Sequence, residues 1–384
     1  MEYTTVLIVL ALVFGFYMAW NIGANDVANA MGTSVGSGAL TFKRAVILAA
    51  ILEFAGAFFV GSSVSDTVRK GIVDPIIFAG DPQAFVLGML SALLAAGVWL
   101  QIASYFGWPV STTHSIVGAI VGFGVVYGGI SAVEWGGVGK IAASWIISPL
   151  MSGTISFIIF QIVMNRVFYR ADPVAAARKF TPYMVFIVLG IMTLVMVFKG
   201  LKNLHLDLSF PSALGVASIV GLLGAGVSIL LLRRYKTDDS LEEQRQAREL
   251  YTTRAMQRAL KHLARARQAA DSDEQSSIDA VMKETRALTD TSVKRANLGS
   301  SNSEFRQVER IFIFLQILTA CFVAFAHGAN DVANAIGSLS AAVQTIQDGV
   351  VAAKSVVPMW ALALGGVGIV IGLATYGWRV METV

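Results

Sequence analysis

The octapeptide Gly-Ala-Asn-Asp-Val-Ala-Asn-Ala occupies residues 23–30 and returns, letter for letter, at residues 328–335. Each copy follows an apolar run, 5–20 or 311–326, that is short for a membrane span of about 20 residues. Short apolar segments that are interrupted by glycine and polar residues, at matching places in two halves of a chain, are typical of binding sites at mid-membrane. The repeat therefore predicts two related halves that meet at a polar site.

The polar residues of the octapeptide predict a break in each helix. Backbone groups that are freed inside a bilayer must be paired by protein, ions or water, and Asn and Asp tolerate turns and cap the half-helix that follows. The positive end of that half-helix would face a bound anion, while the carboxylates of Asp26 and Asp331 suit a small cation. The alternative is a packing motif, in which Gly and Ala bring helices close together. An intramembrane Asp, which costs roughly 3 kcal/mol on insertion scales, favours binding.

The composition predicts an all-α polytopic membrane protein. Hydrophobic residues make up 55% of the chain and charged residues 14%, and the mean hydropathy is +0.66. A soluble domain is thereby excluded. We expect the apolar segments to lie at 5–20, 45–64, 84–103, 109–130, 141–164, 182–198, 210–232, 311–326 and 359–376.

One long segment departs from this composition and divides the chain into three parts. Residues 233–310 carry 16 of the 29 Lys and Arg and 13 of the 25 acidic residues, so they form a soluble, charged helical insert. Residues 1–232 precede it with the first transmembrane repeat and the following spans, and residues 311–384 begin the second repeat. The near balance of signs in the insert argues against a nucleic-acid partner. The single cysteine, Cys321, excludes an intrachain disulfide.

Two further polar features interrupt the apolar segments. Glu53 lies in the middle of its segment, and a carboxylate in hydrocarbon is either protonated or faces a polar cavity, which indicates a site or relay residue. Pro109 suggests a helix that starts there, with hydroxyl groups and the imidazole of His114 in its first turn. Free N–H groups and hydroxyls at such an end can cradle an oxyanion. The alternatives are a neutral Glu hydrogen-bonded between helices and hydroxyls that bond their own helix carbonyls.

The order of segments predicts inverted topology. Seven apolar segments separate the starts of the two octapeptides, and an odd number of crossings inverts the second copy. Basic residues cluster between segments at 166–179, and with this loop on the inside the insert 233–310 is also cytoplasmic. The fold class is therefore two inverted-topology repeats with broken helices, plus the soluble insert.

The paired octapeptides, the stretch Pro-Val-Ser-Thr-Thr-His at 109–114 and the charged insert together resemble the inorganic phosphate transporter (PiT) family. The resemblance spans nearly the whole chain and implies a multi-pass symporter of the plasma membrane, such as a bacterial inner membrane. It implies that phosphate enters with Na⁺ or H⁺ and that no cofactor takes part. Beyond the lipid bilayer, no macromolecular partner is implied, and a homo-oligomer stays open.

The resemblance also assigns site residues. It implies phosphate contacts from Ser111, Thr112, Thr113, Asn25 and Asn330. It implies cation binding or coupling by Asp26, Asn29, Asp331, Asn334 and Glu53. Asp26 and Asp331 would ligate the metal if the cation is Na⁺, and His114 would support the site.

The sequence departs from the family pattern in one respect. The family carries a second Pro-x-Ser-Thr-Thr-His in its C-terminal half, and this sequence does not. Ser111 follows Ala30 by 81 residues, so a counterpart would lie near position ~420 if the repeats are of similar length. We therefore expect residues 1–384 to be part of a longer transporter, with an incomplete two-fold site and an open gap opposite residues 111–113.

Two rival functions remain at this stage. A permease for another tetrahedral oxyanion, such as sulfate or arsenate, would need the same geometry. A membrane-embedded hydrolase could use Ser111 and His114, which lie three residues apart on one helical face, with an intramembrane carboxylate. The repeated polar motif favours a carrier over this enzyme, because alternating access explains a duplicated site and hydrolysis does not.

Overall fold

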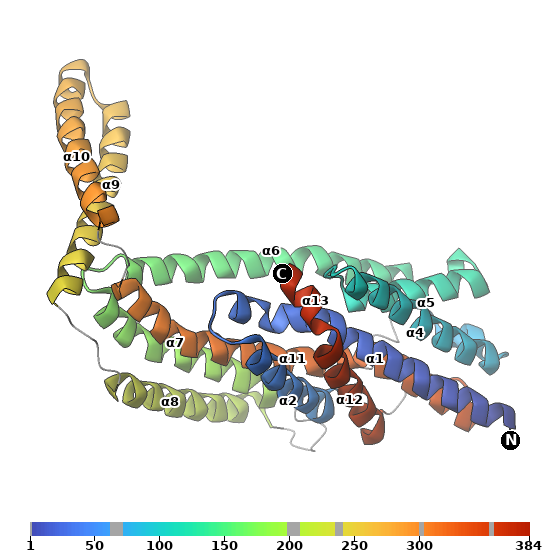
Figure 1. Cartoon of the computed structure of the whole chain (residues 1–384). Helices are drawn as coiled ribbons and strands as arrows, with labels where there is room; N and C mark the ends of the chain where they lie inside the picture. The colour runs from blue at the N-terminus through green and yellow to red at the C-terminus, as the bar shows by residue number, and fades with distance from the viewer. Residues whose placement is uncertain (1, 62–71, 198–207, 235–240, 299–302, 353–356) are drawn as a thin grey trace. The chain divides into compact units, whose positions relative to one another are not determined.

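The computed structural model describes residues 2–61, 72–197, 208–234, 241–298, 303–352 and 357–384. These residues are almost entirely helical (Figure 1), and their β pairing is limited to an isolated bridge between Val73 and Val133. The α-helices are α1 (Glu2–Gly36), α2 (Phe42–Val60), α4 (Pro82–Tyr105), α5 (Thr112–Gly128), α6 (Trp135–Val163), α7 (Pro173–Val195), α8 (Phe210–Arg234), α9 (Leu241–Ala269), α10 (Ser272–Leu298), α11 (Ser303–Asp348), α12 (Met359–Thr375) and α13 (Gly377–Thr383). The prediction of an all-α protein is confirmed.

Six of the described helices are long and apolar enough to cross a membrane, namely α1, α4, α6, α7, α8 and α11. The pair α12 and α13 passes the same test as one span that bends by 60°. Helix α5 is shorter, with 17 residues. Helix α2 matches the predicted segment 45–64 up to residue 60, and residues 62–64 lie outside the described part of the chain. The membrane class predicted from composition agrees with these helices.

The chain forms two compact units. The first comprises Met1–Leu150, Val188–Gly221 and Gln316–Val384, and it holds both octapeptides and a continuous apolar core. The second comprises Met151–Ile187 and Leu222–Leu315. Helices α1, α2, α4, α11 and α12 contribute alanines to this core, so these helices approach one another closely.

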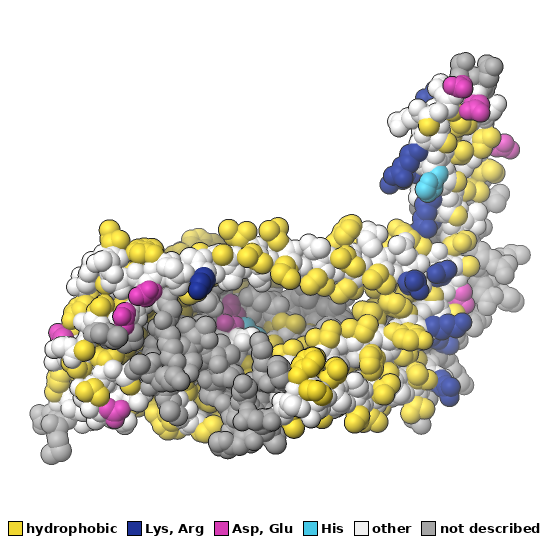
Figure 2. Space-filling view, turned by 180° about the vertical axis from the view of Figure 1, so that it is seen from behind, with side chains coloured by type: hydrophobic (Ala, Val, Ile, Leu, Met, Phe, Trp, Pro, Cys, Tyr) yellow, Lys and Arg dark blue, Asp and Glu magenta, His cyan; other side chains and the backbone are white. Residues whose placement is uncertain are grey.

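The second unit contains the charged insert. Helices α9 and α10 pack together as a hairpin, and its joins at 235–240 and 299–302 lie outside the described residues. The insert was predicted to be helical, and the helices Leu241–Ala269 and Ser272–Leu298 agree with this prediction. Arg258 places its guanidinium carbon 3.2 Å from the centre of the Tyr169 ring, which ties α9 to the end of α6. Figure 2 shows Lys and Arg side chains gathered on and beside the hairpin, while hydrophobic side chains cover the membrane helices.

Both octapeptides lie inside continuous helices, so the prediction of a helix break at each copy is wrong. Helix α1 runs for 35 residues and α11 for 46, and residues 23–30 and 328–335 lie within them without interruption. Backbone groups stay paired in the helix, and the Asn and Asp side chains need not cap a half-helix. The described break among the spans is instead the bend between α12 and α13.

The glycine that opens each octapeptide is a helix crossing point. A Cβ atom added to Gly23 would lie 1.9 Å from the carbonyl oxygen of Ile369 in α12. A Cβ atom added to Gly328 would lie 2.0 Å from the carbonyl oxygen of Glu53 in α2. Only glycine permits backbones to meet this closely. The packing role that we considered as an alternative is therefore present alongside the polar residues.

The two crossings are copies of each other. On the opposite helices, a Cβ at Gly372 would lie 1.8 Å from the oxygen of Trp20, and one at Gly56 would lie 2.0 Å from the oxygen of Phe325. Trp20 and Phe325 occupy the same place, three residues before their octapeptide glycines. One turn further on, the same pairing recurs for Gly377 with Val27 and Gly61 with Val332. Helix α1 thus crosses α12 as α11 crosses α2.

The two octapeptide helices run in opposite directions (Figure 1). Gln316, early in α11, donates to Ser34, late in α1, at 3.2 Å. Gly15, early in α1, lies against Leu339, late in α11. This antiparallel arrangement of two equivalent crossings is the inverted-topology repeat predicted from the order of segments.

We expect Gly23→Ala and Gly328→Ala to destabilise the protein by about 1–3 kcal/mol or more, because the new methyl group would overlap a backbone oxygen. Thermal unfolding of the detergent-solubilised protein measures this effect. Gly118→Ala and Gly122→Ala in α5 are matched controls, since a Cβ at either position meets nothing within 4 Å. Equal melting temperatures for all four variants would contradict the close crossings.

Candidate functional site

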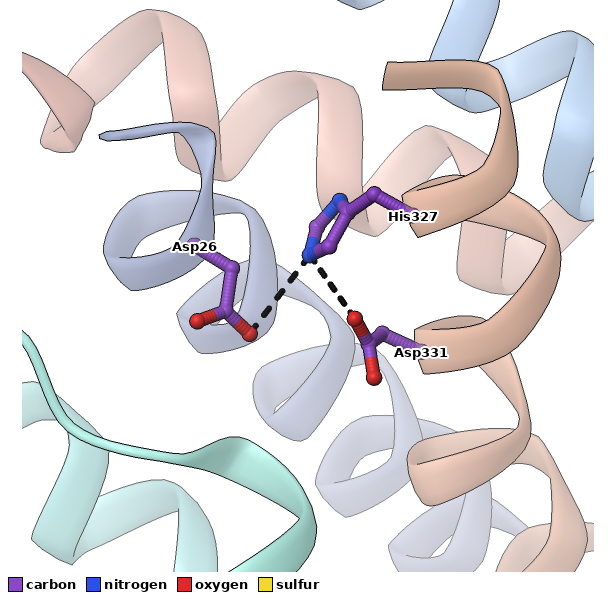
Figure 3. Close-up of side chains that lie close together, drawn as sticks. All are labelled: Asp26, His327 and Asp331. Atoms are coloured by element: carbon purple, nitrogen blue, oxygen red, sulfur yellow. Dashed lines mark ion pairs between the residues drawn. The ribbon is translucent and has the colours of Figure 1, made fainter. Parts of the chain in front are cut away.

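Two aspartates and a histidine meet where α1 and α11 cross (Figure 3). The Nε2 atom of His327 lies 2.9 Å from Oδ2 of Asp331 and 3.5 Å from Oδ2 of Asp26. One ligand atom from each of the three residues lies within 4.8 Å of the others. The two octapeptide aspartates are therefore brought together, as the duplicated motif predicts, and oxygen and nitrogen ligands of this spacing can hold a small cation.

Glu53 joins this group from α2. Its Oε1 atom lies 3.3 Å from Nδ1 of His327, on the side of the ring opposite the aspartates. Glu53 is fully buried, and Asp26 is 4% exposed. The sequence-based expectation that Glu53 faces a polar site is consistent with this contact.

The group is short of hydrogen bonds. In the part of the chain that the structure describes, both oxygens of Glu53 and both ring nitrogens of His327 lack a hydrogen bond of good geometry, although the ion-pair contacts given above reach Glu53 Oε1 and both ring nitrogens. Buried charged atoms are costly unless they are paired and hydrogen-bonded. Such orphaned atoms fit a site whose remaining partners are a ligand, an ion or water.

The second Asn of each octapeptide bonds the Asp three residues before it. Asn29 donates to Oδ1 of Asp26 at 3.1 Å, and Asn334 donates to Oδ1 of Asp331 at the same distance. The two differ in their surroundings, because Asn29 is exposed and Asn334 is 2% exposed. Each Asn orients one carboxylate, as a second shell does around a metal ligand.

Asn334 also reaches the start of α5. Its Nδ2 atom lies 3.1 Å from Oγ1 of Thr113 and 3.4 Å from Oγ1 of Thr112. Both hydroxyls act as acceptors in these contacts, and the Thr112 hydroxyl also hydrogen-bonds the Asp26 carboxylate, so the Thr113 hydroxyl is the one that can donate its hydrogen to an anion. One amide group therefore connects the aspartate pair with the hydroxyl cluster.

Helix α5 begins at Thr112, with Ser111 as its N-cap. The Ser111 hydroxyl accepts a hydrogen bond from the backbone N–H of His114 at 3.2 Å. The prediction that the helix begins at Pro109 is wrong by three residues, because Ser is a strong N-cap. The N–H groups of the first turn lack partners inside the helix and point, with the positive end of its dipole, out of the N-terminus.

Asn25 holds the segment before α5 in place. Its Nδ2 atom donates to Oγ of Ser104 and to the carbonyl of Trp108, each at 3.0 Å, and its Oδ1 accepts from the N–H of Val110 at 3.0 Å. Phosphate oxygens need donors, and both amide hydrogens of this fully buried Asn are taken. The amide hydrogens of Asn25 are therefore used within the chain in this structure, and its direct contact with phosphate stays a prediction.

The equivalent Asn in the second octapeptide differs. Asn330 is exposed. The structure thus separates two residues that the identical motifs treat alike, and a phosphate contact of Asn330 stays a prediction.

His114 does not pair with Ser111 through its ring. The imidazole is exposed and packs on the indole of Trp145, with 3.8 Å between ring centres. A nucleophilic serine needs a base within hydrogen-bond reach of its hydroxyl. The geometry that a hydrolase would require is therefore missing from the described residues around Ser111, and the supporting role of His114 stays a prediction.

The sequence analysis missed His327, the residue at the centre of the site. A signal was available, because the residue before the octapeptide glycine is Ile22 in the first copy and His327 in the second. An ionisable residue inside a membrane segment is by default a functional residue. Comparison of the positions that flank the two copies would have found it.

Comparisons with known proteins point to one family. A family model described as the phosphate transporter family matches residues 22–384. Inorganic phosphate transporter 2-1, chloroplastic, of Arabidopsis thaliana is 42% identical over 383 residues, which are 99% of this chain and 58% of that protein. A putative phosphate permease of Chlamydia pneumoniae is 40% identical over 98% of this chain and 78% of its own length.

A solved structure, described as the sodium-dependent phosphate transporter, resembles the chain with a TM-score of 0.77 at 33% identity. The match covers 98% of this chain and 77% of that structure. This chain therefore spans less than two thirds of the Arabidopsis relative and about three quarters of the other two proteins.

We expect Ser111→Ala to lower stability by about 1 kcal/mol through loss of the helix cap, and Ser111→Asn to restore it. Thermal unfolding of the two variants tests the cap. The apparent phosphate constant of each variant then separates capping from binding. A capping role alone predicts that Ser111→Asn binds phosphate as the wild type does, whereas a direct contact predicts weaker binding in both variants.

Proposed function

The chain belongs to the phosphate transporter family, and we propose that it carries inorganic phosphate across a membrane by symport with a cation. Its relatives are named as phosphate transporters and permeases and not as enzymes. A multi-pass helical protein with a polar site between inverted repeats supports a secondary carrier.

The observation that carries the proposal is the position of Asn334. This side chain bonds Asp331 on one side and the hydroxyls of Thr112 and Thr113 on the other. A symporter couples the movement of its cation to that of its anion, and a shared side chain links the two sites through direct contacts. We assign Asp26 and Asp331 to the cation and the start of α5 to phosphate.

The residues that we assign to the phosphate site are hydrogen-bond donors without a fixed positive charge. Ser111, Thr112 and Thr113 supply hydroxyls, and the first turn of α5 supplies N–H groups at the positive end of the helix dipole. These donors suit a tetrahedral oxyanion. A nearby cation held by the aspartates would strengthen the binding of the anion, since opposite charges attract strongly where water is scarce.

We propose Na⁺ as the coupling cation. Carboxylate oxygens from Asp26 and Asp331 are hard ligands that suit it, and a relative with a solved structure is described as sodium-dependent. H⁺ is the second candidate, because the same site contains His327 and buried carboxylates that can exchange a proton.

Alternating access follows from the inverted repeat in this proposal. Inverted-repeat carriers expose one site to each side in turn by rocking one repeat against the other. The equivalent crossings of α1 with α12 and of α11 with α2 supply the two related halves. The residues of both sites lie where α1, α11 and α5 meet.

Reconstitution into liposomes tests this function. We expect labelled phosphate to accumulate under an inward Na⁺ gradient, because the gradient drives the coupled cation through the site. Accumulation under a pH gradient alone would assign H⁺ instead. Sulfate and arsenate, added as competitors, test the anion, and stronger inhibition by sulfate than by phosphate would contradict the substrate assignment.

Asp26→Asn and Asp331→Asn should each sharply reduce gradient-driven uptake, because the amide removes a charged cation ligand. Asp348→Asn, at the exposed end of α11, is the matched control and should leave uptake unchanged. Near-normal uptake in either of the first two variants would remove that aspartate from the mechanism.

Thr112→Val and Thr113→Val should raise the apparent phosphate constant about 5- to 150-fold, because each removes a hydroxyl worth roughly 1–3 kcal/mol. Initial uptake rates over a range of phosphate concentrations, at saturating cation, measure this change. An unchanged phosphate dependence in both variants would place the anion elsewhere.

A further inference from the structure

The two halves of the site are equivalent in backbone but differ in side chains. Ile22 and His327 correspond, because each directly precedes an octapeptide glycine. Glu53 and Ile369 correspond, because the carbonyl of each meets such a glycine. One half therefore pairs a histidine with a glutamate, and the other half has isoleucines at both equivalent positions.

We propose that Glu53 and His327 form a positioning pair that holds Asp26 and Asp331 at the spacing required for cation binding. This inference rests on the proposed function and adds the residues that set its cation affinity. The pair acts from one half of the inverted repeat alone. Its apolar equivalent, Ile22 with Ile369, packs the other crossing, between α1 and α12, and has no polar role there.

The imidazole of His327 bridges the carboxylates of Asp26 and Asp331. Nε2 of His327 faces both aspartates, at 2.9 Å from Asp331 and 3.5 Å from Asp26. Two carboxylates so close repel each other when charged, and a polar N–H group between them reduces that repulsion. His327 thereby keeps the two cation ligands, which come from different helices, directed at one point.

Glu53 fixes the orientation of the ring. Its Oε1 atom lies 3.3 Å from Nδ1, so a carboxylate stands on each side of the imidazole. The backbone of Glu53 is itself locked against Gly328, the residue that follows His327. A carboxylate behind a histidine that faces a metal site is a common way to set the direction of the ring.

The isoleucine pair shows that packing does not require charge at this crossing. Ile22 and Ile369 are both fully buried in the apolar core. An ion pair buried in a core often contributes no more stability than apolar residues of similar volume. The polar pair at the second crossing is therefore retained for a property other than stability.

The test replaces the polar pair by its own apolar equivalent. In the double variant E53I/H327I, we expect the solubilised protein to melt at a higher temperature than either single variant, because this crossing accepts two isoleucines in the other half, and below the wild type only through the lost imidazole contacts to Asp26 and Asp331. We expect the apparent Na⁺ constant for phosphate uptake to rise at least ~10-fold, the loss typical of second-shell variants. The apparent phosphate constant at saturating Na⁺ should change much less.

The control and the single variants separate positioning from folding. I22V/I369V should leave the Na⁺ dependence unchanged. H327I leaves Glu53 buried without its partner, and E53I leaves the ring without its support, so each single variant should be less stable than the double variant. A melting temperature of E53I/H327I below that of both single variants would overturn the equivalence of the two crossings.

Transposition of the pair tests whether its place in the site matters. In the quadruple variant I22H/E53I/H327I/I369E, the histidine precedes the first octapeptide and the glutamate lies in α12. By the two-fold equivalence, the imidazole would again face Asp26 and Asp331. We expect the apparent Na⁺ constant to recover at least part of the loss. A folded quadruple variant with no recovery would contradict the equivalence of the two positions.

Direct binding of ²²Na⁺ to the purified protein separates this inference from the proposed function. If the wild type accumulates no phosphate under any cation gradient, the proposed function fails, and Na⁺ binding by E53I/H327I still decides the role of the pair. If the double variant binds Na⁺ and takes up phosphate with the same Na⁺ constant as the wild type, the positioning role is wrong, whatever the outcome for transport.

Discussion

Two buried carboxylates and a third that is partly exposed share one imidazole inside an apolar helical bundle, and the surrounding structure makes this arrangement tolerable. Removing carboxylates from water is costly unless each has a partner. His327 contacts Asp26, Asp331 and Glu53, and Asn29 and Asn334 each orient one aspartate. Glycines at the crossings bring α2 and α12 close enough to exclude solvent around it. The polar group and the close packing are thus parts of one design.

In the proposed mechanism, different elements build the anion side and the cation side of the site. Helix α5 offers hydroxyls and N–H groups, while the octapeptide helices offer carboxylates. The position of the segment that leads into α5 depends on α1, because Asn25 of α1 hydrogen-bonds the backbone at Trp108 and Val110. Helix α1 therefore contributes a cation ligand and also supports the anion side, so movement of this helix would affect both.

Inverted repeats are related by symmetry but need not share function equally. The backbone crossings match residue for residue, yet the polar pair at one crossing corresponds to isoleucines at the other. Asn25 and Asn330 likewise differ, one fully bonded in the interior and one exposed. Duplication supplies the two equivalent backbone crossings, and the side chains that differ between the repeats place the polar residues at only one of them.

The sequence by itself determined the membrane class, the inverted repeat, the helical insert and the pairing of Asp26 with Asp331. Hydropathy and an exact repeat can be recognised in a sequence without any information on tertiary contacts. Tertiary structure decided the rest. The sequence Gly-Ala-Asn-Asp is equally compatible with a continuous helix and a broken one. The structure shows that the helix is continuous and that Gly328 lies in it where the backbone of α2 approaches closely. The bonds of Asn25 depend on residues 79 to 85 positions away, and the central place of His327 depends on residues more than 270 positions away. Such contacts arise from packing between helices, which local pattern does not encode.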